Sequence, residues 1–274
     1  MTSNVMNIPG NLAIIAGNGV YPRLLAEGAR KAGVEKIVAA AFTGETDPTL
    51  EQHVELVEWM RVGQLGRLLK FFRSQNIHHA IMAGQIAPKN LFDLRPDLKA
   101  LMLLGKLKER NAESIFAAIA DELAKIDVDL LPATTFLEDS LAQSGLIAGP
   151  KLSLRQERDV ELGWSVAKEI ARLDIGQTIV IKSGTIVAVE ALEGTNEAIK
   201  RGGTLAREGA VVVKVGKPNQ DMRFDVPVIG VETIRVAAES AVRVIAVESE
   251  KTLLLERDAI ADLANRSNIS IIAS

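Results

Sequence analysis

The stretch NLAIIAGNGVYPRLLAEGARKAG, residues 11–33, has the pattern of a strand, a glycine turn and a helix. The apolar run over 11–17 predicts a buried strand, and the apolar spacing over 21–33 predicts a helix that ends at Gly33. A second apolar run, KIVAAAF over 36–42, predicts the next strand. Strand, helix and strand in this order are typical of a βαβ unit with parallel strands.

The same alternation continues through the first half of the chain. Further strands are predicted over 54–59, 79–84 and 128–133, and helices over 64–76 and across 97–126. Because alternating strands and helices build a parallel sheet with flanking helices, we predict a Rossmann-like N-terminal domain over 1–134.

The second half of the chain follows a looser stretch. Residues 135–152 are rich in turn-forming residue types and predict a linker. A helix is predicted over 154–174, and two β-branched runs joined by Ser183 and Gly184 predict a hairpin. Strands and helices then alternate to the end, so the predicted fold class is α/β with two domains. The second, over 153–274, is expected to be a catalytic α/β domain with a mixed sheet.

Composition and charge exclude several classes of protein. The chain has 274 residues and a net charge of −3 at pH 7, so it lacks the global basic field that binds nucleic acid. It has no cysteine, which excludes a thiolate nucleophile, disulfides and cysteine metal sites. No apolar run approaches the ~18 residues of a membrane span and no signal peptide is evident, so we expect a cytoplasmic protein.

Two glycine turns follow predicted strands, GNG at 17–19 and GQ at 84–85. Glycines let a backbone approach a ligand closely, and a following helix N-terminus attracts phosphate. The dinucleotide fingerprint has a third glycine where this chain has Pro22, and the second strand does not end on an acidic residue, which argues against NAD. Plain strand-to-helix turns are the alternative. The substrate-binding candidates here are Ile15, Gly17, Asn18, Gly19, Tyr21, Gly84 and Gln85.

A third motif is VAVEALEGTNEAIKRGG over 187–203. Glu190 and Glu193 end a predicted strand, and Thr195 is placed to cap the following helix. Carboxylates in this position could hold Mg²⁺ through water, so Glu190 is a metal candidate. Glu193, Gly194 and Thr195 are substrate-binding candidates, with ordinary helix-start charges as the alternative.

The fourth motif is VVVKVGKPNQDMRFDVPVIG over 211–230. In extended backbone Asp221, Arg223 and Asp225 would share one face, with Met222 and Phe224 on the other. Basic side chains neutralise phosphate oxygens, whereas an aspartate binds a divalent cation or accepts a proton from water. A surface ladder of alternating charges is the alternative. The catalytic candidates are Asp225, Asp221, Arg223, Lys214 and Lys217; Asp225 and Asp221 are also metal candidates, and Gln220 is a substrate-binding candidate.

The motifs AGNGVYP, VAVEALEGTNEAIKR and above all VVKVGKPNQDMRFDVPVIG resemble those of the LpxI family of UDP-2,3-diacylglucosamine pyrophosphatases. The resemblance covers essentially the whole chain. It implies a cytoplasmic enzyme of lipid A synthesis that uses Mg²⁺ to hydrolyse UDP-2,3-diacylglucosamine to UMP and 2,3-diacylglucosamine 1-phosphate (lipid X). It also implies that Asp225 is the key catalytic position. Asn196 departs from the family pattern, in which an aspartate is expected.

Partners and rival functions remain open at this point. The stretch LKALMLLGKLKER over 98–110 is compatible with lipid contact or with the surface of the inner membrane, but a buried helix is the favoured explanation of the same residues. A homodimer is compatible with the sequence. A noncatalytic nucleotide-sugar binding protein would explain the glycine turns and the basic loop, and a nicotinamide-dependent oxidoreductase would explain the first turn.

Overall fold

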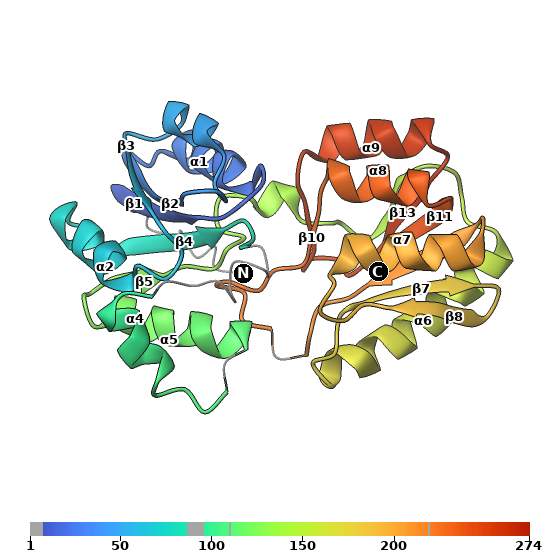
Figure 1. Ribbon diagram of the computed structural model, residues 1–274. Helices are drawn as coiled ribbons and strands as arrows, with labels where there is room; N and C mark the ends of the chain where they lie inside the picture. The colour runs from blue at the N-terminus through green and yellow to red at the C-terminus, as the bar shows by residue number, and fades with distance from the viewer. Residues whose placement is uncertain (1–7, 87–95, 110, 219) are drawn as a thin grey trace, which may run out of the picture. The chain divides into compact units, whose positions relative to one another are not determined.

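The structure, a computed structural model, describes residues 8–86, 96–109, 111–218 and 220–274 (Figure 1). The chain divides into two units, each with its own sheet. Unit 1 comprises residues 1–137 and 222–225, and unit 2 comprises residues 138–221 and 226–274.

Unit 1 contains a five-stranded parallel sheet in the order β3-β2-β1-β4-β5. Its strands are β1 (Asn11–Ala16), β2 (Lys36–Phe42), β3 (Leu56–Met60), β4 (His79–Ala83) and β5 (Asp129–Leu130). This is the strand order of a Rossmann fold, in which strands are added on one side of β1 up to β3 and then on its other side from β4. The predicted Rossmann-like parallel sheet is therefore confirmed.

Helices surround this sheet because its central strands are apolar on both faces. They are α1 (Tyr21–Ala32), the 3₁₀ helix η1 (Pro48–Gln52), α2 (Leu65–Ser74), α4 (Leu98–Leu104) and α5 (Ala112–Ala124). α1 ends as predicted at Gly33, whose φ of 105° is easily adopted only by glycine. Phe72 of α2 and Leu123 of α5 are fully buried in the same core as Val38 of β2.

Unit 2 contains a six-stranded mixed sheet in the order β6-β13-β11-β9-β7-β8. β13, β11 and β9 are parallel, whereas β6, β7 and β8 each pair antiparallel with their neighbours. The strands are β6 (Gly145–Ala148), β7 (Thr178–Lys182), β8 (Thr185–Val189), β9 (Ala210–Lys214), β11 (Val242–Val247) and β13 (Ser270–Ala273). A short parallel pair, β10 (Val228–Ile229) and β12 (Leu253–Leu254), stands apart. The predicted mixed sheet is confirmed.

Helices α6 (Leu154–Arg172) and α7 (Thr195–Ala206) pack on opposite faces of strand β7. A Cβ on Gly163 of α6 would lie 2.1 Å from Ile181, and one on Gly202 of α7 would lie 2.5 Å from Val180. Because neighbouring residues of a strand face opposite ways, these two glycines bring both helices close to the sheet. α8 (Val231–Glu239) and α9 (Arg257–Arg266) complete the unit.

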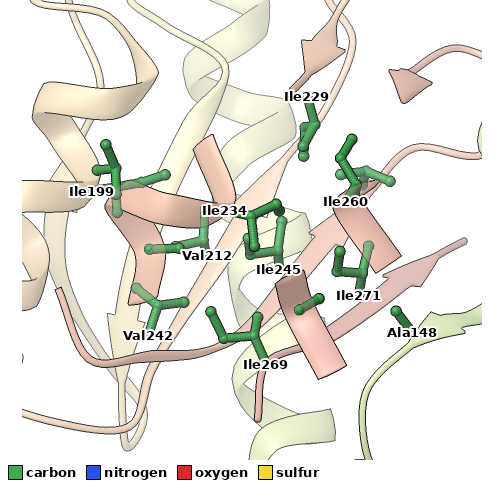
Figure 2. Packing of buried hydrophobic residues seen from close by; sticks show 14 of the residues in the cluster. Ala148, Ile199, Val212, Ile229, Ile234, Val242, Ile245, Ile260, Ile269 and Ile271 are labelled. Carbon is green, nitrogen blue, oxygen red and sulfur yellow. The ribbon is translucent and has the colours of Figure 1, made fainter. Parts of the chain in front are cut away.

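The buried side chains on one face of this sheet form a single apolar cluster (Figure 2). Val212 of β9 and Ile245 of β11 lie at its centre, and Ile234 of α8 and Ile260 of α9 cover them. All four side chains are at most 1% exposed. Close packing of branched apolar residues of this kind holds α8 and α9 on the sheet.

Two connecting segments have a defined structure, the stretch between the two predicted domains and the turn between β7 and β8. Residues 135–152, predicted as a linker, include a 3₁₀ helix η2 (Glu138–Ser140) and the edge strand β6. The predicted hairpin of β7 and β8 turns at Ser183 and Gly184, with φ of 53° and 76°. Positive φ at both central residues is the geometry of a type I′ turn.

No helix within the described ranges is long and apolar enough to cross a membrane.

Candidate functional site

The two predicted glycine turns of unit 1 lie against each other. β1 and β4 are hydrogen-bonded neighbours, so the turns that follow them meet at one edge of the sheet. The Gly17 N–H donates to the Ala83 carbonyl at 2.8 Å, and the Asn18 N–H donates to the Gln85 carbonyl at 2.7 Å. In an open parallel sheet, ligands bind at the carboxyl ends of the two neighbouring strands between which the strand order reverses, here β1 and β4.

The contact between the turns explains two of the glycines without a ligand. A Cβ on Gly17 would lie 2.6 Å from the Gln85 carbonyl oxygen, and one on Gly84 would lie 2.5 Å from the Asn18 carbonyl oxygen. Gly19 differs, because no atom lies within 4 Å of its would-be Cβ although its φ is +87°. Of these three glycines, Gly19 therefore has open space beside it, and this space lies at the start of α1.

The N-terminus of α1 borders a small hollow of about 20 Å³. Val20 caps the helix without a side-chain hydrogen bond, so the first N–H groups of α1 are not satisfied by a capping side chain. Lining residues come from this turn and from the segment after β2: Gly19, Val20, Pro22, Arg23, Thr46, Asp47, Thr49 and Leu50. Backbone and side-chain hydrogen bonds from Thr49 lower the pKa of Asp47.

Two other candidates in unit 1 serve the core. Ile15 is 9% exposed within β1. Tyr21 is buried, and its hydroxyl donates to the Ala133 carbonyl at 2.5 Å. Burial raises the pKa of Tyr21. Their predicted contact with substrate stays a prediction, but the Tyr21 hydroxyl already has a structural partner.

Unit 2 contains a buried polar cluster of Lys214, Thr195 and Glu190. Lys214 ends β9, Glu190 follows β8, and Thr195 is the first residue of α7. Lys214 Nζ donates to Thr195 Oγ1 at 2.6 Å, and that hydroxyl donates to Glu190 Oε1 at 2.9 Å. Lys214 is 5% exposed and Glu190 is 7% exposed. The threonine hydroxyl thus bridges two oppositely charged groups that are largely removed from water.

The second oxygen of Glu190 is also engaged. The Gln177 N–H donates to Glu190 Oε2 at 3.4 Å. Gln177 Oε1 is buried and has no hydrogen-bond partner within the part of the chain that the structure describes. Thr195 was expected to cap α7, and this is wrong: Gly194, with φ of 84°, is the N-cap. The Thr195 side chain bonds to Glu190 and Lys214 instead of to the helix backbone.

Glu193 stabilises the loop between β8 and α7. It forms a 2.5 Å ion pair with Arg201 and accepts a 3.1 Å hydrogen bond from the Ala191 N–H. Arg201 also donates to the Val189 carbonyl at 2.7 Å. The Arg201 hydrogen bond lowers the pKa of Glu193, so this carboxylate is anionic at neutral pH.

The loop after β9 is held in place by Glu248. Glu248, which follows β11, accepts from the Gly216 N–H at 2.7 Å and from Lys168 Nζ at 2.5 Å. Its other oxygen pairs with Lys251 at 2.7 Å. Burial acts to raise the pKa of Glu248, but the two lysines and the Gly216 N–H outweigh it and lower that pKa.

Lys217 and Gln220 form the next part of this loop. The Lys217 N–H donates to Gln220 Oε1 at 3.0 Å, and Lys217 Nζ pairs with Asp174 at 2.5 Å. Gln220 Nε2 is buried without a hydrogen-bond partner within the described ranges. The loop therefore presents an amide donor that its own described neighbours do not satisfy.

Residues 222–225 depart from the predicted extended ladder. Met222, Arg223 and Phe224 form a turn, so the expectation that Asp221, Arg223 and Asp225 share one strand face is wrong. The cause is anchoring in unit 1, to which residues 222–225 belong, whereas Asp221 belongs to unit 2. Arg223 and Asp225 are half-buried.

Two contacts fix this turn. The Ala133 N–H donates to the Met222 carbonyl at 2.7 Å. The Phe224 ring lies 5.7 Å from the Phe116 ring and packs on the unit 1 core, as predicted for its side of the segment. Burial of an aromatic ring is a stronger determinant here than alternation of charge.

Both halves of the chain match models of one protein family. The LpxI N-terminal domain matches residues 11–140, and the LpxI C-terminal domain matches residues 143–272. The chain belongs to the LpxI family. The UDP-2,3-diacylglucosamine pyrophosphatase LpxI of Caulobacter vibrioides is 27% identical to it over 272 residues, which cover 95% of this chain and 96% of that relative.

In this LpxI family member nine of the predicted residues fall into three groups. Gly17, Asn18, Gly84 and Gln85 meet at one edge of the unit 1 sheet. Glu190, Thr195 and Lys214 meet in unit 2. Arg223 and Asp225 lie in the 222–225 turn. The roles assigned to all these residues stay predictions.

Sequence reasoning missed Asp47 and Glu248. Asp47 lies five residues beyond the end of β2 and borders the hollow at α1, a position that the search for an acidic residue at the strand end did not reach. Glu248 immediately follows the buried strand β11. A carboxylate directly after an apolar strand was the available signal for Glu248, because such positions gather at one edge of a parallel sheet.

Proposed function

We propose that this chain hydrolyses the pyrophosphate bond of UDP-2,3-diacylglucosamine to UMP and 2,3-diacylglucosamine 1-phosphate in lipid A biosynthesis. The observation that carries the proposal is the match of both halves to the LpxI family, together with a relative of that activity aligned over nearly its whole length. We propose a cytoplasmic enzyme; the predicted homodimer stays a prediction.

Hydrolysis of a phosphoanhydride needs a water molecule in line with the leaving group and positive charge around the phosphate oxygens, with little other chemistry. We assign the orientation of that water to Asp225, with Asp221 as its helper. Arg223, Lys214 and Lys217 supply the positive charge. Support for Lys214 comes from its burial, since a cation removed from water interacts more strongly with an anion than an exposed one.

The candidate carboxylates are chemically suited to Mg²⁺. That ion prefers oxygen ligands, keeps several of its waters, and takes one or two carboxylates together with substrate phosphate oxygens. Among the described residues, no group of three or more histidine, cysteine, aspartate or glutamate side chains is placed to hold a metal ion. Asp225 and Asp221 would hold the ion, which neutralises charge on the phosphate when bound. Glu190 would have to exchange its bonds to Thr195 and Gln177 to join them.

We propose that the glycine turns bind the uridine nucleotide. The start of α1 supports this, because its N–H groups have no side-chain cap and Gly19 leaves open space beside them. Asp47 in the adjoining hollow is suited to accept hydrogen bonds from sugar hydroxyls.

Phosphorus NMR tests the proposal. The protein is mixed with detergent-dispersed UDP-2,3-diacylglucosamine and Mg²⁺, then with EDTA, alongside Asp225→Ala and the control Asp262→Ala on the exposed surface of α9. We expect two pyrophosphate signals to give way to two monoester signals in the wild type and the control only, and only with Mg²⁺. Persistent pyrophosphate signals with bound nucleotide would instead identify a noncatalytic nucleotide-sugar binding protein.

A further inference from the structure

Helix α4 exposes apolar side chains on one face. Leu98 is 72% exposed, Leu101 is 53% exposed and Met102 is 52% exposed. Residues spaced by three and four positions lie on the same side of a helix, so these three side chains form one surface. We call Leu98, Leu101 and Met102 the α4 apolar face.

The rest of α4 is firmly attached to unit 1. Ala100 is 6% exposed, and Leu103 packs against the core that contains Phe72. Asp97 caps the helix by accepting from the Ala100 N–H at 2.9 Å, and also accepts from the Gly66 N–H of α2 at 2.7 Å. These contacts fix the rotation of α4, so the exposure of its apolar face follows from the fold.

A salt bridge adds a further attachment. Lys99 Nζ lies 2.6 Å from Glu122 Oε2, which joins α4 to α5. Glu122 is 6% exposed, and a second lysine, Lys125, pairs with its other oxygen at 2.7 Å. α4 is thus held by its cap, its core contacts and an ion pair.

Lysines outnumber acidic residues in the described segment around the α4 apolar face. Residues 96–109 include three lysines, Lys99, Lys106 and Lys108, against Asp97 and Glu109. Lys106 and Lys108 are both exposed and follow the helix within four residues of its end. Apolar side chains combined with exposed lysines match the two properties of an anionic bilayer surface, apolar acyl chains beneath negative headgroups.

We propose that the α4 apolar face, with Lys106 and Lys108, docks this protein on the surface of an anionic lipid bilayer. A seven-residue helix is ~10 Å long, far too short for a ~30 Å hydrocarbon core, so α4 lies at the interface rather than across it. Docking would bring the active site to a substrate that carries two acyl chains, and this benefit rests on the proposed function. The docking itself does not.

The size of the surface favours a bilayer over a protein partner. A stable protein interface buries about 800 Å² on each side, more than three side chains of one short helix supply. A bilayer has no such minimum, because partial insertion of a few side chains together with lysine–headgroup attraction gives weak, reversible binding.

Vesicle sedimentation tests the proposal. The full chain is spun with vesicles of phosphatidylcholine alone or with one third phosphatidylglycerol, at low and high salt. The test variant is Leu98→Gln/Leu101→Gln/Met102→Gln, and the control is Leu154→Gln/Leu173→Gln/Leu205→Gln, which changes three equally exposed leucines of unit 2 without altering charge. Thermal unfolding checks that both variants fold.

We expect the wild type and the control to bind anionic vesicles at least fivefold more than neutral ones, with loss of binding at high salt. The test variant should bind at least fivefold less than the wild type, and Lys106→Gln/Lys108→Gln should lose the preference for anionic vesicles. Absence of wild-type binding, or equal binding by the test variant, would overturn the proposal. So would a wild-type dimer that the test variant turns into a monomer in sedimentation velocity, since the occupant would then be a second copy.

The failure of this proposal is distinguishable from that of the proposed function. Hydrolysis of detergent-dispersed substrate by the test variant should equal that of the wild type, because detergent removes the need for docking. If the wild type hydrolyses nothing in detergent but sediments with anionic vesicles as described, the proposed function fails and the docking surface stands.

Discussion

Strand ends are built differently in the two units. In unit 1, β1 and β4 end in glycine turns whose backbones touch, with Gly17 and Gly84 leaving no room for a Cβ between them. In unit 2, the ends of β8 and β9 bear Glu190 and Lys214, joined through Thr195. The unit 1 edge thus depends on close contact between glycine backbones, whereas the unit 2 edge depends on hydrogen bonds between buried polar side chains.

This difference determines how each edge can be damaged. The glycine edge fails when an atom is added, because the neighbouring backbone cannot withdraw without breaking its hydrogen bonds. The charged edge fails when an atom is removed, because the remaining polar groups stay buried without partners. Substitutions that add or remove single groups therefore test the comparison directly.

The largest effect is expected for Lys214→Met. Methionine preserves much of the side-chain volume but removes the buried ammonium group that donates to Thr195, whose hydroxyl donates to Glu190. We therefore expect a loss of about 3 kcal/mol in the free energy of unfolding. Urea denaturation monitored by circular dichroism measures it. Lys217→Met is the matched control, because its exposed pair with Asp174 contributes less than about 1 kcal/mol. Equal losses in both variants would show that burial of Lys214 has no energetic consequence.

A smaller loss is expected for Gly84→Ala. The new Cβ would meet the Asn18 carbonyl oxygen at 2.5 Å, and alanine is strained at a φ of +90°, so we expect a loss of about 2 kcal/mol. Gly19→Ala has the same kind of φ but open space, so backbone strain alone should cost about 1 kcal/mol. The same denaturation measurement compares them. A Gly84→Ala variant as stable as Gly19→Ala would contradict the steric account.

Thr195→Val tests the bridge within the polar cluster. Valine keeps the shape of threonine but removes the hydroxyl between Lys214 and Glu190, and we expect a loss of about 1–2 kcal/mol. Thr195→Ser keeps the hydroxyl and should retain most of the stability. If Thr195→Val is as stable as the wild type while Thr195→Ser is not, packing of the methyl group matters and the hydroxyl bridge does not.

The last effect is a pH dependence in unit 1, which is absent at neutral pH and appears only in acid. Hydrogen bonds from Lys125 and Lys99 lower the pKa of Glu122 from 4.5 to about 2. A carboxyl whose pKa is lower in the folded state stabilises the fold above the unfolded pKa. Its contribution is lost as the pH falls from about 4.5 towards 2. Glu122→Gln should therefore flatten the decline of the thermal unfolding midpoint across that window.

Glu197→Gln is the control for this measurement. Glu197 also pairs with a lysine, Lys200, but both side chains are more than half exposed. Its removal should leave the acid branch of the curve unchanged. An identical flattening in both variants would contradict the assignment of this pH dependence to Glu122.

Much of the fold follows from local pattern. The strand over 36–42 coincides with β2 and the helix over 21–33 with α1 and its Gly33 cap, because apolar period and capping residues are properties of short stretches. β6 within 135–152 has no such pattern. It is an edge strand whose first two residues are exposed, and pairing with β13 from the far end of the chain makes it a strand.

The candidate site divides in the same way. The glycines and charged residues that follow the strands could be identified from the sequence alone. The partners were not: Thr195 bonds to Lys214, 19 residues away, rather than capping its helix. Residues 222–225 turn into the unit 1 core because Phe224 packs beside Phe116.

Periodicity, turn chemistry and motif were thus enough to predict an α/β chain with two sheets and its LpxI family membership, whereas the roles of its candidate site residues stay predictions. Which of those residues meet depended on long-range packing. A backbone hydrogen bond between Asn18 and Gln85, or a hydroxyl shared by Lys214 and Glu190, forms only when strands distant in sequence become neighbours. Local preferences carry no information about such pairs, because the energy that selects them arises from burial in the assembled core.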